Sequence, residues 1–278
     1  MTKLFFIREI NENTEWTQGL LSQDVVIHCA ARAHIMNEEV ADPLTAYRQV
    51  NVDGTLNLAR QAADAAVKRF IYISSIKVNG ESTSGNVPFV EKDIAKPLDP
   101  YGVSKYEAEE GLKKIAADTG MEVVIIRPPL VYGSGVKANF LNLLKLANTS
   151  LPLPLGMVNN KRSMVYVENL IDFIVKCIDH PAAANQTFFI SDNHDLSLTG
   201  LLRLIRNSMN KPARLIPMPV FFFKLAGLIF RQQDVVDRLV GDLQVDSSKA
   251  MSLLDWKPPY TVEQGIQATV DSFLKNKK

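Results

Sequence analysis

FIYISS, residues 70–75, is a compact apolar run that ends in two serines. A short, continuous apolar run bounded by small polar residues is typical of a strand that is buried on both faces of a parallel sheet. The stretch before it, residues 44–67, carries apolar side chains at mixed spacings of three and four, which is the pattern of a helix. The sequence therefore predicts a helix over 44–67 and a buried strand over 70–75.

The same order of strand and helix continues on both sides of this strand. Upstream, DVVIHCAA at 24–31 is a second apolar run that ends in small residues. Downstream, Pro100–Thr119 has a helical pattern that Gly120 stops, and Met121–Ile126 predicts the next strand. Alternating strands and helices at this spacing predict an α/β fold with a Rossmann-like, doubly wound parallel sheet and right-handed crossovers.

Chemistry in such a sheet gathers at the carboxyl ends of the strands. In this chain those ends are Ala30 and Ala31, Ser74 and Ser75, and the loop 127–129. We expect these residues to meet at one edge of the sheet, where candidate catalytic and binding groups converge.

The alternation loosens beyond Gly133. A helix is predicted from about Glu168 to Asp179 and a strand near 186–191, and several helices follow. We expect residues 1–134 to hold the sheet domain and residues 135–278 to form a smaller, mostly helical substrate lobe. This lobe should be interleaved with the far edge of the sheet, because no clean linker separates the two parts.

The most apolar stretch of the chain is Leu215–Phe230, which contains three consecutive phenylalanines at 221–223. It also contains Pro217, Pro219 and Lys224, so it falls short of a membrane span. We expect a buried helix of the second lobe here, with a peripheral contact to a membrane as the alternative.

Composition narrows the possible functions. The 278 residues are 46% hydrophobic and 22% charged. Because 31 basic and 30 acidic residues leave a net charge of only +1, the overall charge does not attract the protein to nucleic acid. Cys29 and Cys177 are too few for a disulfide framework and form no metal-type cluster with the four histidines. These features, with an apolar run at Met1–Arg8 that is too short for a signal peptide, predict a cytoplasmic protein.

Tyr101 and Lys105 are four residues apart in the predicted helix 100–119 and therefore face the same side. The lysine ammonium can then lie beside the tyrosine phenol and favour its ionised form. A phenol with an ordinary pKa of ~10 becomes usable as an acid or base near neutral pH. The alternative is an ordinary tyrosine and a solvated lysine on an amphipathic helix.

Six further segments accompany this pair. Together the chain resembles an extended short-chain dehydrogenase of the nucleotide-sugar epimerase and dehydratase family, over nearly its whole length. The branch that it resembles is the UDP-glucose 4-epimerase-like one, which includes 4-keto-sugar reductases. The segments are HCAA at 28–31, NVDGT at 51–55, SSIKVNG at 74–80, RPPLVYG at 127–133, RSMVYV at 162–167, and DSSKA at 246–250 with WKP at 256–258.

The resemblance implies an enzyme in which Tyr101 is the acid/base, Ser75 orients the reacting O4 of a UDP-hexose, and Lys105 binds the nicotinamide ribose of NAD or NADP. It also implies a set of cofactor-binding residues and a set of substrate-binding residues, and Tyr101, Ser75 and Lys105 belong to one or both of them. The cofactor set is Cys29, Ala30, Ala31, Asn51, Ser74, Tyr101, Lys105 and Pro128, and the substrate set is Ser75, Lys77, Tyr101, Arg162 and Arg238.

Simpler roles remain open for several of these residues. Asn51 could only tie a helix to a neighbouring loop, and Arg162 could be a surface arginine. Whether Arg238 makes a second contact to the phosphates is equally open. We interpret His28 and His34 as structural, and no metal site is expected.

The first departure from the family pattern concerns Ile76 and Lys77, which stand where family dehydratases usually have Asp and Glu. An apolar residue and a cation cannot perform the proton chemistry of water elimination, so a 4,6-dehydratase is not expected. What remains is redox chemistry at C4, as an epimerase or as an NAD(P)H-dependent 4-keto reductase, for cell-surface polysaccharide sugars.

The second departure is that no Gly-x-x-Gly-x-x-Gly turn occurs in the sequence, although this fold uses one to approach the pyrophosphate. If Lys3–Arg8 is the strand before the one at 24–31, then a first βαβ unit of about 50 residues is missing. We therefore expect an N-terminally truncated dinucleotide-binding domain with impaired NAD(P) binding.

Several consequences of that departure stay open in the sequence. The truncation could be that of a gene product, a mis-set start or a remnant without activity. An inactive relative that binds only a sugar nucleotide or a protein partner is therefore an alternative function. The resemblance also implies a homodimer that pairs through the helix with Tyr101 and the long helix before it, and the choice between NAD and NADP remains open.

Overall fold

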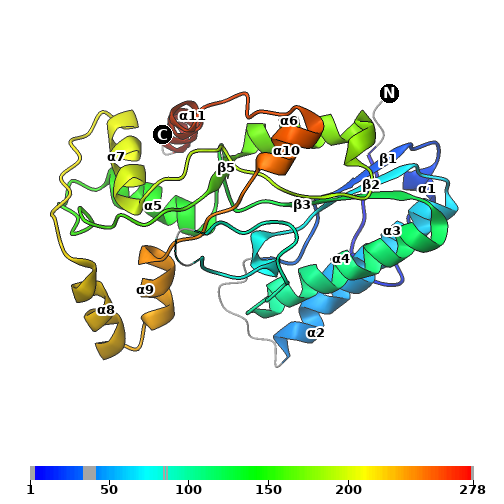
Figure 1. The fold of residues 1–278 in the computed structure, drawn as a ribbon, viewed down its shortest axis with the longest axis horizontal. Helices are drawn as coiled ribbons and strands as arrows, with labels where there is room; N and C mark the ends of the chain where they lie inside the picture. Colours follow the sequence, from blue (N-terminus) through cyan, green and yellow to red (C-terminus); the bar gives the residue numbers. More distant parts are fainter. Residues whose placement is uncertain (1–3, 34–41, 84, 86, 277–278) are drawn as a thin grey trace.

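A computed structural model of the chain describes residues 4–33, 42–83, 85 and 87–276. Its main sheet has four parallel strands, in the order β1, β2, β3 and β6, with helices on both faces (Figure 1). This arrangement confirms the predicted α/β fold. The strands are β1 Val25–His28, β2 Arg69–Ile73, β3 Glu122–Arg127 and β6 Thr187–Phe189.

Alternate residues of the central strands face opposite layers of helices, as the period of two in a strand requires. Phe70 and Tyr72 of β2 belong to the apolar core under α3 and α4. Ile71 of the same strand, with Ile126 of β3, belongs to the core under α6 and α10. Both faces are therefore buried, which is why these strands are continuous apolar runs in the sequence.

One layer is made by a helical segment that runs from residue 43 to residue 64, as predicted from the apolar spacing. It consists of α2 Pro43–Arg48, a π-helical turn Gln49–Gly54, and α3 Thr55–Asp64. Gly54 lies where an added Cβ would meet the Ile10 side chain at 2.6 Å, so the close packing of the turn on the N-terminal segment needs a glycine. A short helix, α1 Thr17–Leu20, packs nearby on α3.

The second helix of this layer, α4, spans Pro100–Thr119, the bounds that the sequence predicts. Asp99 caps its first turn by accepting a hydrogen bond from the Gly102 amide at 2.6 Å. Gly120 follows the last turn with a φ of 77°, a left-handed conformation that glycine adopts without strain. Local signals at both ends thus set the length of the helix that carries Tyr101 and Lys105.

The other face of the sheet is covered mainly by α6 Val167–Asp179 and α10 Ser248–Leu254 (Figure 1). The predicted helix over Glu168–Asp179 is thus confirmed. A single 3₁₀ turn, Pro181–Ala183, leads into β6, which pairs with the end of β3 at the far edge of the sheet.

A second apolar core lies beside the sheet. It is built around a small parallel pair, β4 Leu130–Tyr132 and β5 Met164–Tyr166, together with α5, α7 and α11. The helices are α5 Ala138–Asn148, α7 Leu198–Ser208 and α11 Val262–Lys275.

The apolar stretch around residues 215–230 forms α8 Val220–Ile229, followed by α9 Gln233–Val240. The expectation of a buried helix is wrong, because Gly227 is the one buried residue of α8 and most of its large apolar side chains are exposed. α8 packs mainly on α9, and the two helices stand apart from the layers that cover the sheet (Figure 1). A run rich in apolar residues predicts a helix, but it does not show whether neighbouring elements cover that helix.

The expected strand at Lys3–Arg8 is also wrong for the residues that are described there. Residues 4–8 have no regular structure, and the side chains of Leu4 and Phe6 are 95% and 93% exposed. A strand needs a neighbour for its backbone hydrogen bonds, and within the described residues β1 pairs with β2 alone. β1 is accordingly an edge strand, with Ile27 exposed.

Candidate active site

The ends of β2 and β3 are joined by backbone hydrogen bonds that place the predicted site residues side by side. The Ser74 amide donates to the Ile126 carbonyl at 2.7 Å, and the Ile76 amide donates to the Pro128 carbonyl at 3.1 Å. Ser75 then caps a 3₁₀ turn, Ile76–Val78, by accepting from the Lys77 amide at 3.3 Å. The turn leaves Ser75 at the carboxyl end of the sheet, as expected.

The first turn of α4 packs closely on this 3₁₀ turn. A Cβ at Gly102 would lie 2.7 Å from the Lys77 carbonyl oxygen, so only glycine lets the helix approach. The Lys77 ammonium also pairs with the carboxylate of Asp99, the residue that caps α4. This packing brings Tyr101 close enough to Ser75 for the serine hydroxyl to affect the pKa of the phenol.

Burial raises the pKa of the Tyr101 phenol to about 12. The nearby Ser75 hydroxyl lowers the pKa of the phenol, while Asp99 and Tyr47 raise it further. The Tyr47 ring from α2 packs against Tyr101 edge to face at 6.1 Å. Tyr101 is therefore a neutral phenol at pH 7, which can donate a proton but must first ionise to accept one.

We expected the Lys105 ammonium to favour ionisation of Tyr101, and the structure differs from that expectation. The Lys105 amine donates to the Ile73 carbonyl oxygen at 2.7 Å and lies 4.4 Å from the centre of the Tyr72 ring. Its charge is thus directed at the end of β2, and it is not among the groups that shift the pKa of Tyr101.

Lys105 is itself perturbed. Its side chain is 2% exposed, and desolvation lowers its pKa to about 8, although the charges of Glu109 and Cys29 partly oppose the shift. A buried ammonium is costly, and a lysine with a pKa this low is typical of a functional site.

The low pKa of Lys105 predicts a stability difference that depends on pH. A lysine in the unfolded chain has a pKa of ~10.4, above the folded value of about 8. Burial of the ammonium therefore lowers the free energy of unfolding by its full amount below pH 8. This loss of stability disappears as the pH rises toward the pKa of the unfolded chain. In urea unfolding followed by circular dichroism, the stability of Lys105→Met relative to wild type should fall by up to ~3 kcal/mol between pH 7 and 10.5.

Lys114→Met, which removes an exposed lysine of the same helix, is the matched control for this experiment. A relative stability of Lys105→Met that stays constant over the whole pH range would contradict the assigned desolvation.

Asn51 shows the structural role that the sequence left open. Its side-chain carbonyl accepts from the Arg32 amide at 2.8 Å, and its amide group donates to the Arg32 carbonyl and to Ser104 Oγ at 3.1 and 3.0 Å. It thereby ties the loop after β1 to the π-helical turn and to α4.

The end of β1 contributes small side chains to the same edge. Cys29 and Ala30 are exposed and Ala31 is half-buried, and Cys29 is close enough to Lys105 to affect its pKa. His28 lies beneath them and bonds to Thr55 Oγ1 at 2.9 Å. Burial, and then the charge of Lys105, lower the pKa of His28 to about 4, so it is neutral at pH 7 and suits a structural role. His34 lies outside the described residues.

A buried ion pair that the sequence did not reveal holds α4 against these strand ends. Glu109 and Arg127 form a two-point contact, with Nε to Oε1 at 2.9 Å and Nη2 to Oε2 at 2.5 Å. Ser74 Oγ donates to the Glu109 carboxylate at 2.5 Å, and Arg127 donates to Asn79 Oδ1 at 2.9 Å. The available signal was the spacing, because Glu109 is four residues after Lys105 and eight after Tyr101 on one helix face.

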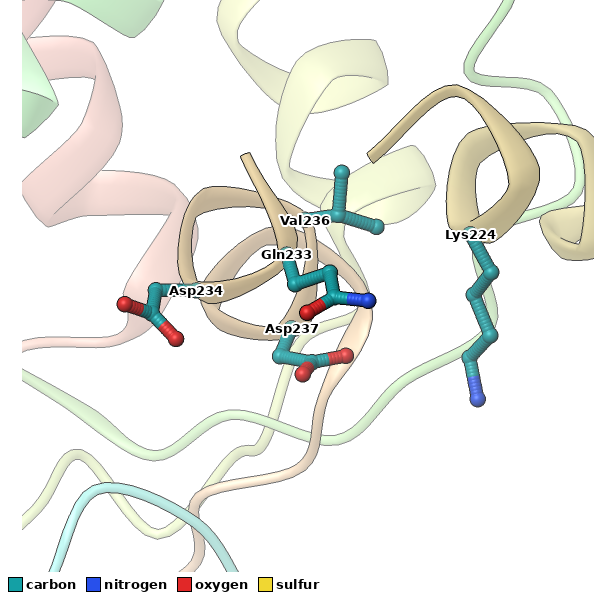
Figure 2. Close-up of a pocket in the computed structure, with 5 residues that line it drawn as sticks. All are labelled: Lys224, Gln233, Asp234, Val236 and Asp237. Carbon is teal, nitrogen blue, oxygen red and sulfur yellow. The ribbon is translucent and has the colours of Figure 1, made fainter. Parts of the chain in front are cut away.

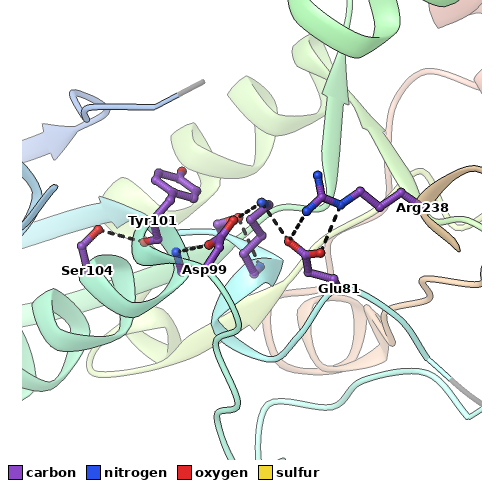
Figure 3. Close-up of polar contacts among 8 residues, drawn as sticks. Glu81, Asp99, Tyr101, Ser104 and Arg238 are labelled. Carbon is purple, nitrogen blue, oxygen red and sulfur yellow. Dashed lines mark hydrogen bonds and ion pairs between the residues drawn. The ribbon is translucent and has the colours of Figure 1, made fainter. Parts of the chain in front are cut away.

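The expected substrate residues form a second group beside the first. Lys77 pairs with Glu81 at 3.1 Å as well as with Asp99, and Arg238 of α9 reaches Glu81 at 3.2 Å (Figure 3). Arg162 donates to the Arg238 carbonyl oxygen at 2.8 Å. Lys77, Arg162 and Arg238 thus form one connected group with the carboxylates of Glu81 and Asp99.

The residues present fit one half of a dinucleotide site. A buried lysine, a hydroxyl pair and small side chains at the strand ends suit the nicotinamide ribose, and an exposed edge at Ala30 leaves room for it. The pyrophosphate half would need a glycine-rich turn, and the sequence has none. Among the described residues no cluster of potential metal ligands is found, and no helix is long and apolar enough to cross a membrane.

The fold and this site define a dehydrogenase of the extended short-chain type. Residues 5–191 match the NAD dependent epimerase/dehydratase family, and the chain belongs to that family. It is 51% identical to a UDP-glucose 4-epimerase of Vibrio cholerae over 98% of this chain and 83% of that protein. An undecaprenyl-diphosphate-linked N-acetylglucosamine 4-epimerase of Escherichia coli O157:H7 is 29% identical over 98% of this chain and 84% of that protein.

Solved structures share the fold at lower identity. UDP-glucuronic acid 4-epimerase from Bacillus cereus, in complex with NAD, gives a TM-score of 0.78 at 23% identity over 98% of this chain and 81% of that chain. UDP-glucose 4-epimerase from Thermotoga maritima, with UDP-glucose, gives 0.74 at 22% identity over 99% and 85%. The fold and the family expected from the sequence are therefore confirmed.

Proposed function

We propose that this chain acts at C4 of a UDP-hexose as a UDP-glucose 4-epimerase-like enzyme. The observation that carries the proposal is the contact between Ser75 and Tyr101 above the buried Lys105, at the carboxyl ends of the strands. The identity to a UDP-glucose 4-epimerase supports the substrate class.

Each side chain has a distinct task in this proposal. Ser75 holds the C4 oxygen in line with Tyr101, which moves the proton at that oxygen. Bound NAD or NADP supplies the acceptor and donor of the C4 hydride. Lys105 would hold the nicotinamide ribose, and its positive charge would favour the ionised form of the phenol.

A second candidate is the reduction of a 4-keto UDP-sugar. It is favoured by the raised pKa of Tyr101, about 12, because a neutral phenol is ready to give its proton to the oxygen of a ketone that is being reduced. An epimerase needs the phenolate as well, since it must also remove the proton of a C4 hydroxyl group.

The remaining binding assignments belong to the same proposal. Lys77, Arg162 and Arg238 would hold the substrate diphosphate, exchanging their contacts with Glu81 and with backbone carbonyls for phosphate oxygens. Cys29, Ala30, Ala31, Asn51, Ser74 and Pro128 would line the cofactor side.

The wider setting follows from the family resemblance. We propose a dinucleotide-binding part over 1–134 and a substrate lobe over 135–278. A homodimer would pair through α4 and the helical segment 43–64, and the enzyme would serve cell-surface polysaccharide sugars in the cytoplasm.

Replacing the phenol tests the proposed acid/base. Tyr101→Phe should lower the interconversion of UDP-glucose and UDP-galactose by roughly 10²–10⁴-fold, the usual contribution of a positioned acid/base, while UDP-sugar affinity stays within about threefold. Tyr106→Phe, on the same helix, is the matched control and should keep wild-type turnover. Full turnover in Tyr101→Phe would refute the role. Wild-type reduction of a 4-keto UDP-sugar at the expense of NADPH, without epimerisation, would favour the second candidate.

We also propose that this 278-residue chain binds dinucleotide weakly, because the groups that fit the cofactor lie on its nicotinamide side only. Calorimetric titration with NADH should give a dissociation constant above about 100 μM. UDP-glucose, titrated into the same preparation, should bind more tightly than NADH. This second titration is the control that the protein is folded. A micromolar constant for NADH would contradict the proposal.

A further inference from the structure

The outer face of α8 is an apolar surface that no other described element covers. We define this outer face by Phe221, Phe222, Leu225, Leu228 and Ile229. At about 100° per residue these five side chains fall within an arc of about 120°. Their exposure is 66%, 54%, 41%, 60% and 66%, respectively. Contiguous exposed apolar side chains of this kind mark an interaction surface rather than ordinary protein surface.

The opposite side of the helix explains how α8 is held. Val220 and Phe223 pack against the core of the second lobe, and Gly227 allows Val236 of α9 to approach, since an added Cβ would lie 2.9 Å from its Cγ2. Polar groups lie on yet another side, where Lys224 of α8 and Gln233, Asp234 and Asp237 of α9 line a shallow hollow (Figure 2). The outer face is thus not needed for folding of the helix pair.

Charge identifies the kind of surface that fits. Residues 211–240, which include both helices, contain five basic residues and two acidic ones, Asp234 and Asp237 of α9. Of the 31 basic and 30 acidic residues of the chain, 26 and 28 lie elsewhere, so this part carries +3 and the rest of the protein −2. Positive charge is therefore concentrated in the part of the protein that contains the apolar helix.

A short helix with an apolar face, basic flanks and no acidic residue has the character of a helix that lies in a membrane interface. At 10 residues, α8 is about 15 Å long and cannot cross a bilayer. We propose that the outer face of α8 docks this enzyme onto an anionic lipid surface. Aromatic and aliphatic side chains enter the interface, and Lys224 and Arg231 contact acidic head groups.

The position of α8 links this surface to the active site. α9 follows α8 directly and carries Arg238, which reaches Glu81 (Figure 3). Glu81 also pairs with Lys77, which pairs with Asp99, the residue that caps α4. A membrane bound at α8 would thus lie on the substrate side of the molecule, where the expected diphosphate-binding residues converge. The docking proposal itself does not depend on which C4 reaction the enzyme performs.

Vesicle flotation of the full chain tests the proposal. Wild-type protein should float with vesicles of phosphatidylcholine that contain about a third phosphatidylglycerol, and at least tenfold less with pure phosphatidylcholine or in about 0.5 M salt. The pair Phe222→Ser and Ile229→Ser should lower partitioning at least tenfold. Lys224→Glu with Arg231→Glu should lower it on anionic vesicles only.

The matched control replaces two apolar residues elsewhere that are more exposed, Ile94→Ser with Leu98→Ser, and should bind vesicles as wild type does. Circular dichroism confirms that every variant is folded. The proposal is overturned if wild type does not float with anionic vesicles at about 1 mM lipid. It is also overturned if Phe222→Ser with Ile229→Ser floats unchanged. A lipid-free dimer that this variant dissociates, seen by sedimentation velocity, would assign the outer face to a second copy instead.

Discussion

The buried ion pair between Glu109 and Arg127 is the interaction on which the arrangement of the site depends. Both side chains are almost fully buried, so each charge is stable there only while the other is present. Arg127 ends β3, and the Glu109 carboxylate also accepts from Ser74 at the end of β2. One contact therefore fixes α4 across the ends of both strands, and Asn79 extends it to the 3₁₀ turn.

The position of the proposed catalytic residues follows from that anchor. Because Tyr101, Lys105 and Glu109 repeat every four residues, fixing Glu109 directs the other two to the same edge of the sheet. Lys105 then reaches the end of β2, and Tyr101 meets Ser75 where Gly102 allows close packing. A buried pair of charges adds little net stability, but it selects one docking geometry for the helix, which is what proton transfer requires.

The sequence predicted the features that local signals determine. Alternating apolar runs predicted the parallel sheet, and the helical pattern with its stop at Gly120 predicted α4. It could not predict the pair of Glu109 with Arg127, because that contact depends on how α4 lies over β3. Nor could it predict that Lys105 would face β2 rather than the phenol of Tyr101. The exposure of α8 was missed because apolar content alone does not show whether a neighbour covers a helix.

A double-mutant cycle between Glu109→Gln and Arg127→Met tests most directly whether this ion pair holds α4 over the strand ends. The free energy of unfolding would be measured in urea for wild type, both single variants and the double variant. We expect each single variant to lose about 3–5 kcal/mol and the double variant to lose at least about 2 kcal/mol less than their sum. Losses that add to within about 0.5 kcal/mol would contradict the central role of the pair.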